Sequence, residues 1–136
     1  MNKLSDNTIK HLEFIQSTIN RMSSNSFSMK GWMIAIIAAL LALYVDSAPN
    51  NEVYLLLASC ATILFWFIDS YYLYIEIHYR DLYEDIITQS RDIIPFDMSI
   101  KNYRSKRKFF EAMFCSVSTT PLYGVITITL LSFYIF

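Results

Sequence analysis

Three long runs without a charged residue constrain this chain more than any other feature. They lie at Gly31–Val45, Val53–Ile68 and Pro121–Phe136 in a sequence of 136 residues. Such runs are typical of helices that cross a bilayer, which takes about 20 apolar residues. The first run reaches that length with its uncharged flank 26–29 if the Lys30 ammonium extends to the interface. A buried helix of a soluble protein is the alternative, and three such runs in a short chain disfavour it.

The composition favours helices over a β fold. The chain has two Gly and three Pro, whereas turn-rich β folds need more of both. Ahead of the first run, Leu12, Ile15, Ile19 and Met22 recur at helical spacing and predict an amphipathic helix. We expect this helix to break at the polar stretch Ser23–Ser26.

A second helix is expected to extend well beyond its apolar run. Apolar residues continue at helical spacing after the run, which predicts one long helix over Val53–Asp92. Pro95 ends it, because proline disfavours helical geometry in the residue before it. Asp97 or Ser99 is then expected to cap another helix that runs to about Cys115.

The positive charges indicate an orientation. All 11 Lys and Arg residues lie within two blocks, 3–30 and 80–108, and the link 46–52 between the first two runs has none. Cytoplasmic loops carry the excess of Lys and Arg. The rule places the N-terminus and residues 78–117 in the cytoplasm and the short link outside.

The prediction is therefore an all-α integral membrane protein, with a two-span helical hairpin, a third C-terminal span and a small cytoplasmic helical bundle. The bundle combines the N-terminal helix, the extension of the second span and the helix that follows it. The predicted segments are a cytoplasmic amphipathic helix (1–30), a first transmembrane helix (31–47), an outer link (48–52), a second transmembrane helix (53–77), a cytoplasmic extension with a basic segment (78–117) and a third transmembrane helix (118–136).

Two acidic residues follow the second run. In an antiparallel hairpin Lys30 and Asp69 reach the same level, so we predict an ion pair that neutralises two charges that are costly in lipid. Asp69 and Glu76 are seven residues apart and share one helix face. In an oligomer they would ring the inner mouth of a cation path. Salt bridges to basic residues, or hydration at the interface, are the favoured alternative.

Small residues mark one face of the first run. Ala35, Ala38, Ala39 and Ala42 form two pairs with small-xxx-small spacing. Such residues let helix backbones approach closely in lipid. The pattern fits an oligomer contact and also fits packing against the second span of the same chain, and both alternatives stay open.

A basic cluster precedes the third run. Five of the eight residues from 101 to 108 are basic, namely Lys101, Arg104, Lys106, Arg107 and Lys108. Such clusters bind anionic lipid head groups and also nucleic acid. Because no aromatic stacking platform or nucleic-acid fold accompanies the cluster, we predict contact with membrane lipids and expect no nucleic acid.

No pattern in the sequence indicates catalysis. His11 and His78 are too isolated for a metal site or a triad, and Cys60 and Cys115 form no C-x-x-C motif. A Gly-rich phosphate loop is also missing from the sequence. We therefore predict that the protein is not an enzyme and uses no metal and no cofactor.

The segment HLEFIQSTINRMSSNSFSMKGW, residues 11–32, is similar to a family of small bacterial membrane proteins. They share an HLEFIQ…RM…NSF…KGW pattern ahead of two spans, and the resemblance continues in FWFIDSYYL at 65–73. The resemblance implies a location in the bacterial inner membrane. Because the family has no assigned activity, the resemblance implies no catalytic residues. The family's layout is similar to two-span effectors of bacterial anti-phage systems, which permeabilise the inner membrane once a sensor releases or assembles them.

Two functional hypotheses follow. The first is a small oligomeric inner-membrane protein that alters bilayer permeability, as a bacterial defence effector would. This hypothesis rests on the exposed apolar stripes predicted on the cytoplasmic helices. Such stripes need a packing partner, and another copy of the same chain is the simplest one. The alternative is a non-conducting membrane anchor or adaptor that docks a soluble cytoplasmic partner.

Overall fold

The computed structural model describes residues 6–46, 52–88, 94, 96–103 and 106–135, and for residues 106–108 the backbone alone. The described part is all-α, as predicted, and contains no strand. Its elements are α1 (Asp6–Asp46), α2 (Glu52–Thr88), the short 3-10 helix η1 (Lys101–Tyr103), α3 (Lys106–Phe114) and α4 (Thr120–Ile135).

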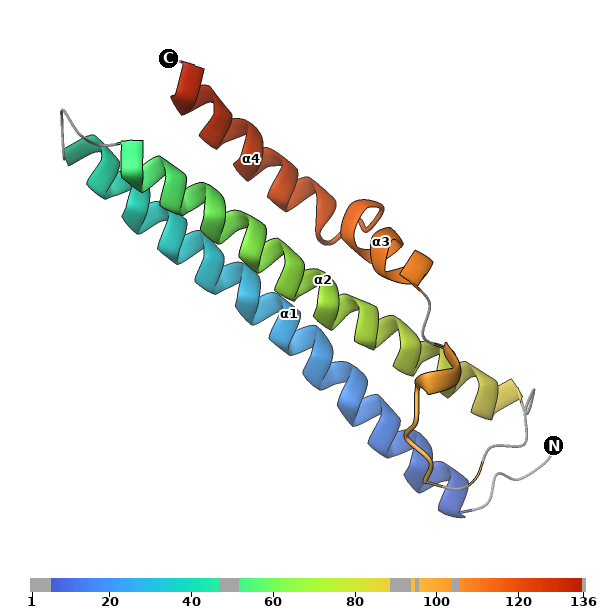
Figure 1. Ribbon diagram of the computed structural model, residues 1–136. Coiled ribbons are helices and arrows are strands. Elements are labelled where there is room, and N and C mark those ends of the chain that lie inside the picture. Colours follow the sequence, from blue (N-terminus) through green and yellow to red (C-terminus); the bar gives the residue numbers. More distant parts are fainter. Residues whose placement is uncertain (1–5, 47–51, 89–93, 95, 104–105, 136) are drawn as a thin grey trace.

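Helices α1 and α2 form one long antiparallel hairpin (Figure 1). At a rise of 1.5 Å per residue they are about 61 Å and about 55 Å long, close to twice the hydrocarbon thickness of a bilayer. Each is long and apolar enough to cross a membrane. Residues 48–51 of the predicted outer link lie outside the described residues, and Glu52 is the first residue of α2.

The predicted break at Ser23–Ser26 is wrong, because α1 continues through it without interruption. Ser and Asn cost only a few tenths of a kcal/mol more than Ala in a helix, and the stretch contains no Gly or Pro. The Ser28 hydroxyl donates to the Ser24 carbonyl at 2.9 Å, and Ser26 is buried against α2. Packing along the whole of α2 therefore outweighs the weak local preference for a break.

The end of the hairpin near the N-terminus has its own apolar core, and we call the paired segments 6–25 and 73–88 the stalk. Ile15 and Ile19 of α1 pack against Leu82 and Ile86 of α2. The face beside this core is covered by partly buried apolar side chains from α2 and from the segment after it, namely Tyr79, Tyr83, Met98, Ile100 and Tyr103.

The helix expected from Asp97 or Ser99 does not begin there. Residues 96–100 are not helical, and Phe96 has a φ of 66°, a left-handed conformation that interrupts a right-handed helix. The Asp97 carboxylate accepts a hydrogen bond from the Ser99 amide at 2.9 Å and so closes a local turn instead of capping a helix. The expected helix is confined to α3, which starts at Lys106. Residues 89–93, the predicted end of the second helix, lie outside the described residues.

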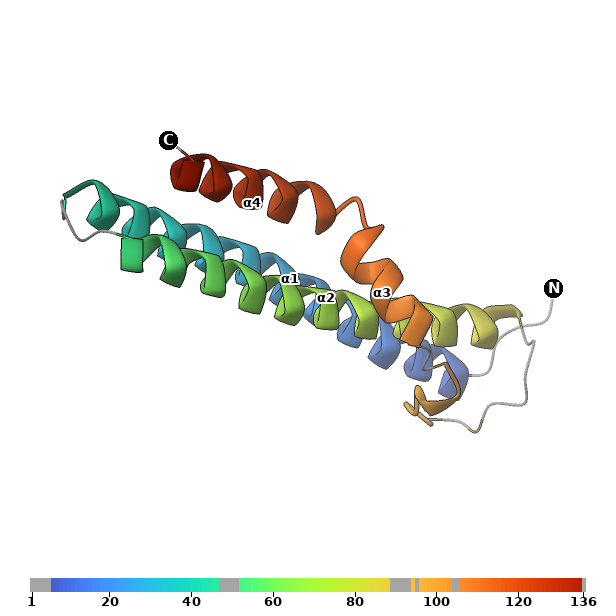
Figure 2. The same ribbon diagram turned by 45° about the horizontal axis from the view of Figure 1, so that its top comes forward.

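Residues 96–103 cross the stalk as a strap (Figures 1 and 2). The His11 Nε2 atom lies 3.1 Å from the Asp97 carbonyl oxygen, and the Tyr103 hydroxyl donates to Asp85 Oδ2 at 2.6 Å. The third member of the predicted bundle is therefore this strap, tied to both helices, and not a helix that starts at residue 97.

Helix α4 lies along the other half of α2 and runs antiparallel to it (Figure 1). Its fully buried Tyr123 packs with Met33 and Ile37 of α1. Further along, Leu130 packs with Leu55 of α2, near the turn end of the hairpin. With 16 residues α4 is about 24 Å long, and near its end Phe133 contacts Tyr44 of α1, with ring centroids 5.8 Å apart.

Candidate functional site

The outer halves of α1 and α2, together with α4, carry large apolar side chains on their surface. We call this surface the apolar belt. It contains Trp32, Ile34, Ile36, Leu43 and Val45 of α1, Val53, Leu56, Leu57, Ile63, Leu64 and Phe67 of α2, and Val125, Ile128, Leu131, Phe133, Tyr134 and Ile135 of α4.

No charged residue interrupts the belt in sequence, since α1 has no charge between Lys30 and Asp46, α2 has none between Glu52 and Asp69, and α4 has none at all. Monomeric soluble proteins rarely expose apolar patches of this extent. The belt ends where Lys30 and Asp69 meet.

The predicted ion pair between Lys30 and Asp69 is present in the structure. Lys30 Nζ lies 2.7 Å from Asp69 Oδ2 and donates to Oδ1 at 2.9 Å. The Asp69 side chain is fully buried, and the Lys30 side chain is 14% exposed. The antiparallel hairpin brings the two residues to one level, and a buried carboxylate needs such a partner because an unpaired charge is costly to bury.

Ser26 completes the polar cluster from the preceding turn of α1. Its hydroxyl donates to Asp69 Oδ1 and accepts a hydrogen bond from Lys30 Nζ at 2.8 Å. The spacing of four residues places Ser26 and Lys30 on one face of α1. Sequence reasoning missed Ser26 because it treated residues 23–26 as a break, although its position four residues before Lys30 was a usable signal.

Helix α4 reaches the same cluster through Tyr123. The Tyr123 hydroxyl donates to the Phe65 carbonyl at 3.2 Å and lies close enough to the Asp69 carboxylate to interact with it. The Trp66 ring stacks on the Tyr123 ring with centroids 5.9 Å apart, and its Nε1 donates to the Met113 carbonyl at 3.1 Å. Residues from α1, α2, α3 and α4 thus meet at one level, and sequence reasoning did not single out Tyr123 as part of this site.

Glu76 has a cation of its own. It is buried, and its Oε1 atom accepts hydrogen bonds from Arg80 Nε at 3.0 Å and from a terminal guanidinium nitrogen at 2.7 Å. Asp69 is paired with Lys30 in the same way. Both acids therefore have intramolecular partners in the single chain, and the geometry favours the salt-bridge alternative over an acidic ring.

Among the described residues, no helix covers the small-residue face of α1. Ala35, Ala38, Ala39 and Ala42 are all exposed. In this stretch α1 buries Met33 and Ile37 instead. Its partly buried Leu40, Leu41 and Tyr44 pack against the cluster of Leu55, Ala58 and Leu130. The structure thus disfavours the alternative in which these alanines pack against α2, and it leaves their face uncovered.

Polar side chains inside the belt bond to their own helices. The hydroxyls of Ser59, Thr62, Thr127 and Thr129 donate to the carbonyls four residues earlier, at 2.9, 2.8, 2.7 and 2.9 Å. Their donors are therefore not directed into a path through the chain.

The basic cluster is described only in part. Lys101 is exposed in η1, and Lys106, Arg107 and Lys108 form the first turn of α3. Arg104 lies outside the described residues. The backbone places the three consecutive cations directly before Phe109, which packs against Phe67 of α2.

The described residues contain no group of three or more His, Cys, Asp or Glu side chains arranged to hold a metal ion. Cys60 and Cys115 are both exposed and unpaired. His78 is fully buried in the stalk, where its Nδ1 atom contacts the Tyr74 carbonyl.

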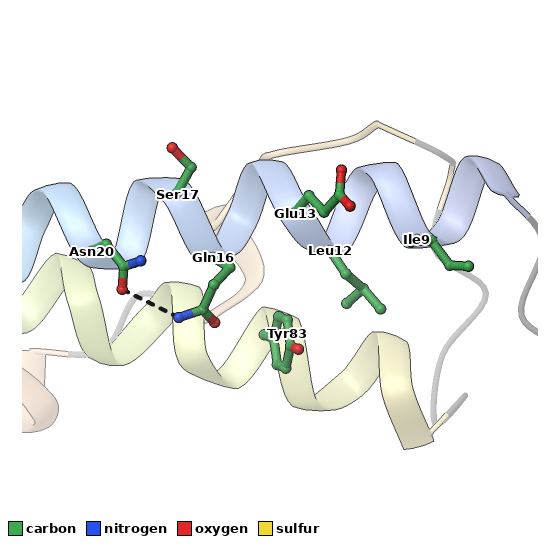
Figure 3. A pocket seen from close by; sticks show the side chains of 7 residues that line it. All are labelled: Ile9, Leu12, Glu13, Gln16, Ser17, Asn20 and Tyr83. Atoms are coloured by element: carbon green, nitrogen blue, oxygen red, sulfur yellow. Dashed lines mark hydrogen bonds between the residues drawn. The ribbon is translucent and has the colours of Figure 1, made fainter.

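A groove lies between the two helices of the stalk, away from the belt (Figure 3). In Figure 3, Gln16 Nε2 donates to Asn20 Oδ1 at 3.2 Å across the groove wall, and Tyr83 of α2 faces the residues of α1. The lining mixes polar and apolar side chains, namely Ile9, Leu12, Glu13, Gln16, Ser17, Asn20 and Tyr83.

Comparison with known proteins finds no matching family model, no similar curated protein and no similar solved structure.

Proposed function

We propose that the protein is inserted in the bacterial inner membrane through α1, α2 and α4, with its N-terminus and stalk in the cytoplasm. The observation that carries this proposal is the apolar belt. A bilayer core of about 30 Å corresponds to about 20 helical residues, which from Glu52 reaches Tyr72 and from Asp46 reaches Ser26. All exposed side chains of the belt then lie in lipid, and the stalk lies in water.

This placement explains why the charges at the end of the belt are paired. Lys30 lies four residues and Asp69 three residues inside the boundary, which is about 5 Å, and an isolated charge is costly there. Their mutual contact at 2.7 Å removes most of that cost. The excess of Lys and Arg on the stalk side sets the orientation.

For the chain inserted in this way, we propose that several copies assemble into an oligomer that alters bilayer permeability, as a defence effector would. In the described residues of one chain, Asp69 and Glu76 are paired with cations and the hydroxyls of the belt bond to their own helices, so these groups line no polar path. A path therefore requires several copies. The exposed face of Ala35, Ala38, Ala39 and Ala42 supports such assembly, since small residues allow close helix approach in lipid.

Expression in a bacterial host with a voltage-sensitive dye tests this proposal. We expect the wild-type chain to depolarise the cells, and the double variant Ala38→Leu/Ala39→Leu to leave the potential intact. Both alanines are exposed, so the variant keeps the fold of the chain. Leu64→Ile serves as a matched control, because Leu64 is exposed on α2 and not on the alanine face of α1, and the change conserves volume.

Wild-type expression without depolarisation, at matched insertion, would contradict the permeability proposal. Depolarisation by the double variant at the wild-type level would contradict the role of the alanine face.

The stalk groove favours a second candidate function, a non-conducting adaptor that docks a soluble cytoplasmic partner. The groove lies on the segment that projects from the membrane, and its polar rim suits a reversible contact. Affinity purification of the full chain from its native host tests it. We expect Ser17→Arg, which fills the groove, to abolish recovery of a stoichiometric partner, whereas Ser23→Arg on the exposed surface outside the groove retains it.

A further inference from the structure

Helix α3 has one face against α2 and one face uncovered. Phe109 packs on Phe67 and Tyr74 of α2, with ring centroids 5.3 and 5.7 Å away. Ala112 is buried behind it. On the opposite face Phe110 and Phe114 remain 59% and 51% exposed, one helical turn apart. Val117, in the turn that leads to α4, is 92% exposed.

The contacts of α3 fix its level along α2. Its C-terminal residue Phe114 lies against Trp66, with ring centroids 5.3 Å apart, and its N-terminal half lies beside Tyr74. The proposed hydrocarbon boundary falls near Tyr72, about 20 residues from the start of α2. Phe114 is therefore on the lipid side of the boundary, and the first turn of α3 lies a few residues outside it, in the head-group layer.

The positive charges of this segment lie at the end of α3 that is nearer to water. The three residues before Phe109 are Lys106, Arg107 and Lys108, and Lys101 lies exposed in η1. Between residues 101 and 117 Glu111 is the sole acidic residue of the sequence. A cationic first turn followed by exposed phenylalanines is the arrangement of an interfacial membrane-binding helix.

We propose that α3 and the turn 115–119 form an inner-leaflet anchor that binds anionic phospholipids. Phe110, Phe114 and Val117 enter the acyl-chain boundary, and the cations at the start of α3 bind the phosphate groups of the lipids. This proposal rests on the proposed membrane insertion and names the lipid class that the inserted protein prefers. It also gives α3 a role different from membership in a cytoplasmic bundle.

Two further features support lipid as the occupant of this face. The apolar side chains of α3 adjoin the apolar belt, because Phe109 packs on Phe67 of the belt and the exposed Phe110 lies beside Phe109. The charge is complementary to the inner leaflet, whose anionic lipids attract clusters of Lys and Arg. At the depth proposed for α3, lipid and not a soluble protein is the surrounding medium of this face.

Site-directed spin labelling of the full chain in phosphatidylcholine–phosphatidylglycerol vesicles tests the depth of α3. Cys60 and Cys115 are exposed, so both are replaced by Ala and single nitroxides are attached at Phe110→Cys and Phe114→Cys. Leu64→Cys in the belt and Ile87→Cys on the stalk are the lipid and water references. We expect positions 110 and 114 to lie on the lipid side of the range set by positions 64 and 87, with higher accessibility to oxygen and lower accessibility to a water-soluble nickel reagent than position 87.

A second measurement tests the lipid class. Spin-labelled phosphatidylglycerol is compared with spin-labelled phosphatidylcholine for association with the wild-type chain and with Lys106→Gln/Arg107→Gln/Lys108→Gln. One near-surface cation contributes roughly fivefold to association with anionic lipid, so we expect the triple variant to lose roughly tenfold or more of its preference. Lys10→Gln, a change at the far end of the stalk, is the control and is expected to retain the preference.

The outcomes separate this proposal from the proposed insertion. If position 64 lies in lipid while 110 and 114 lie in water, the anchor is refuted and membrane insertion stands. If position 64 also lies in water, both proposals are refuted. If 110 and 114 lie in lipid but the triple variant keeps the wild-type preference, the binding of anionic phosphates by the first turn of α3 is refuted.

Discussion

Lys30→Met leaves the fully buried Asp69 carboxylate without its cation. Removing one partner of a buried ion pair costs about 3–5 kcal/mol, whereas an exposed pair is worth about 1 kcal/mol or less. With Asp69 inaccessible and Lys30 only 14% exposed, this pair belongs with the buried ones. The neutral Ser26 hydroxyl still donates to the carboxylate but carries no compensating charge. We therefore expect the free energy of unfolding to fall by about 3–5 kcal/mol.

The double variant Lys30→Met/Asp69→Leu removes both charges and fills their space with apolar side chains. Replacing a buried pair in this way is often neutral or stabilising, so we expect it to unfold within about 2 kcal/mol of the wild type. The charge swap Lys30→Asp/Asp69→Lys is expected to be more stable than either of its single changes, because opposite charges still face each other.

The assay is an SDS titration of the purified chain in mixed micelles, with helix content followed by circular dichroism. Lys10→Met, a change at an exposed residue of the stalk, is the control and is expected to alter the unfolding free energy by about 0.5 kcal/mol or less. A cost below about 1 kcal/mol for Lys30→Met would refute the assignment of a buried pair. A double variant that costs the sum of both single changes would refute the coupling between the two residues.

Two further predictions use the same titration. Ile15→Ala opens the stalk core at a fully buried residue and is expected to cost about 2–5 kcal/mol, whereas the exposed Glu13→Ala changes stability by about 0.5 kcal/mol or less. Equal effects of these two changes would contradict the stalk core. Tyr123→Phe keeps the stacking on Trp66 and loses one donated hydrogen bond, so we expect a loss of about 0.5–1.5 kcal/mol. No loss would show that this hydroxyl does not hold α4 to the hairpin.

Much of the secondary structure could be predicted from hydropathy. The apolar runs predicted the helices that appear as the outer halves of α1 and α2 and as α4. The antiparallel hairpin also followed, since a short link joins two long helices. Lys30 and Asp69 could be paired on that basis alone, because their distances from the link are similar and each charge needs a partner.

Local reasoning failed where tertiary contacts decide the conformation. Ser23–Ser26 resembles a break, but packing on α2 and the bond from Ser26 to Asp69 keep α1 helical there. Asp97 has the chemistry of a helix cap, but it closes a turn in the strap, whose residues are held against the stalk by Tyr103. Sequence propensities are weak compared with such contacts.

The sequence by itself determined the all-α class, the hairpin and the level at which charge meets apolar surface. These features follow from the spacing of apolar and charged residues along one chain, which fixes the length and face of each helix. Only the tertiary structure decided that α4 packs on α2, that Tyr123 lies at the level of the ion pair, and that the alanine face and the side chains of Phe110 and Phe114 stay exposed. The physical reason is that rotation and docking of a helix depend on its neighbours, and α4, apolar on all sides, carries no stripe that specifies which face is buried.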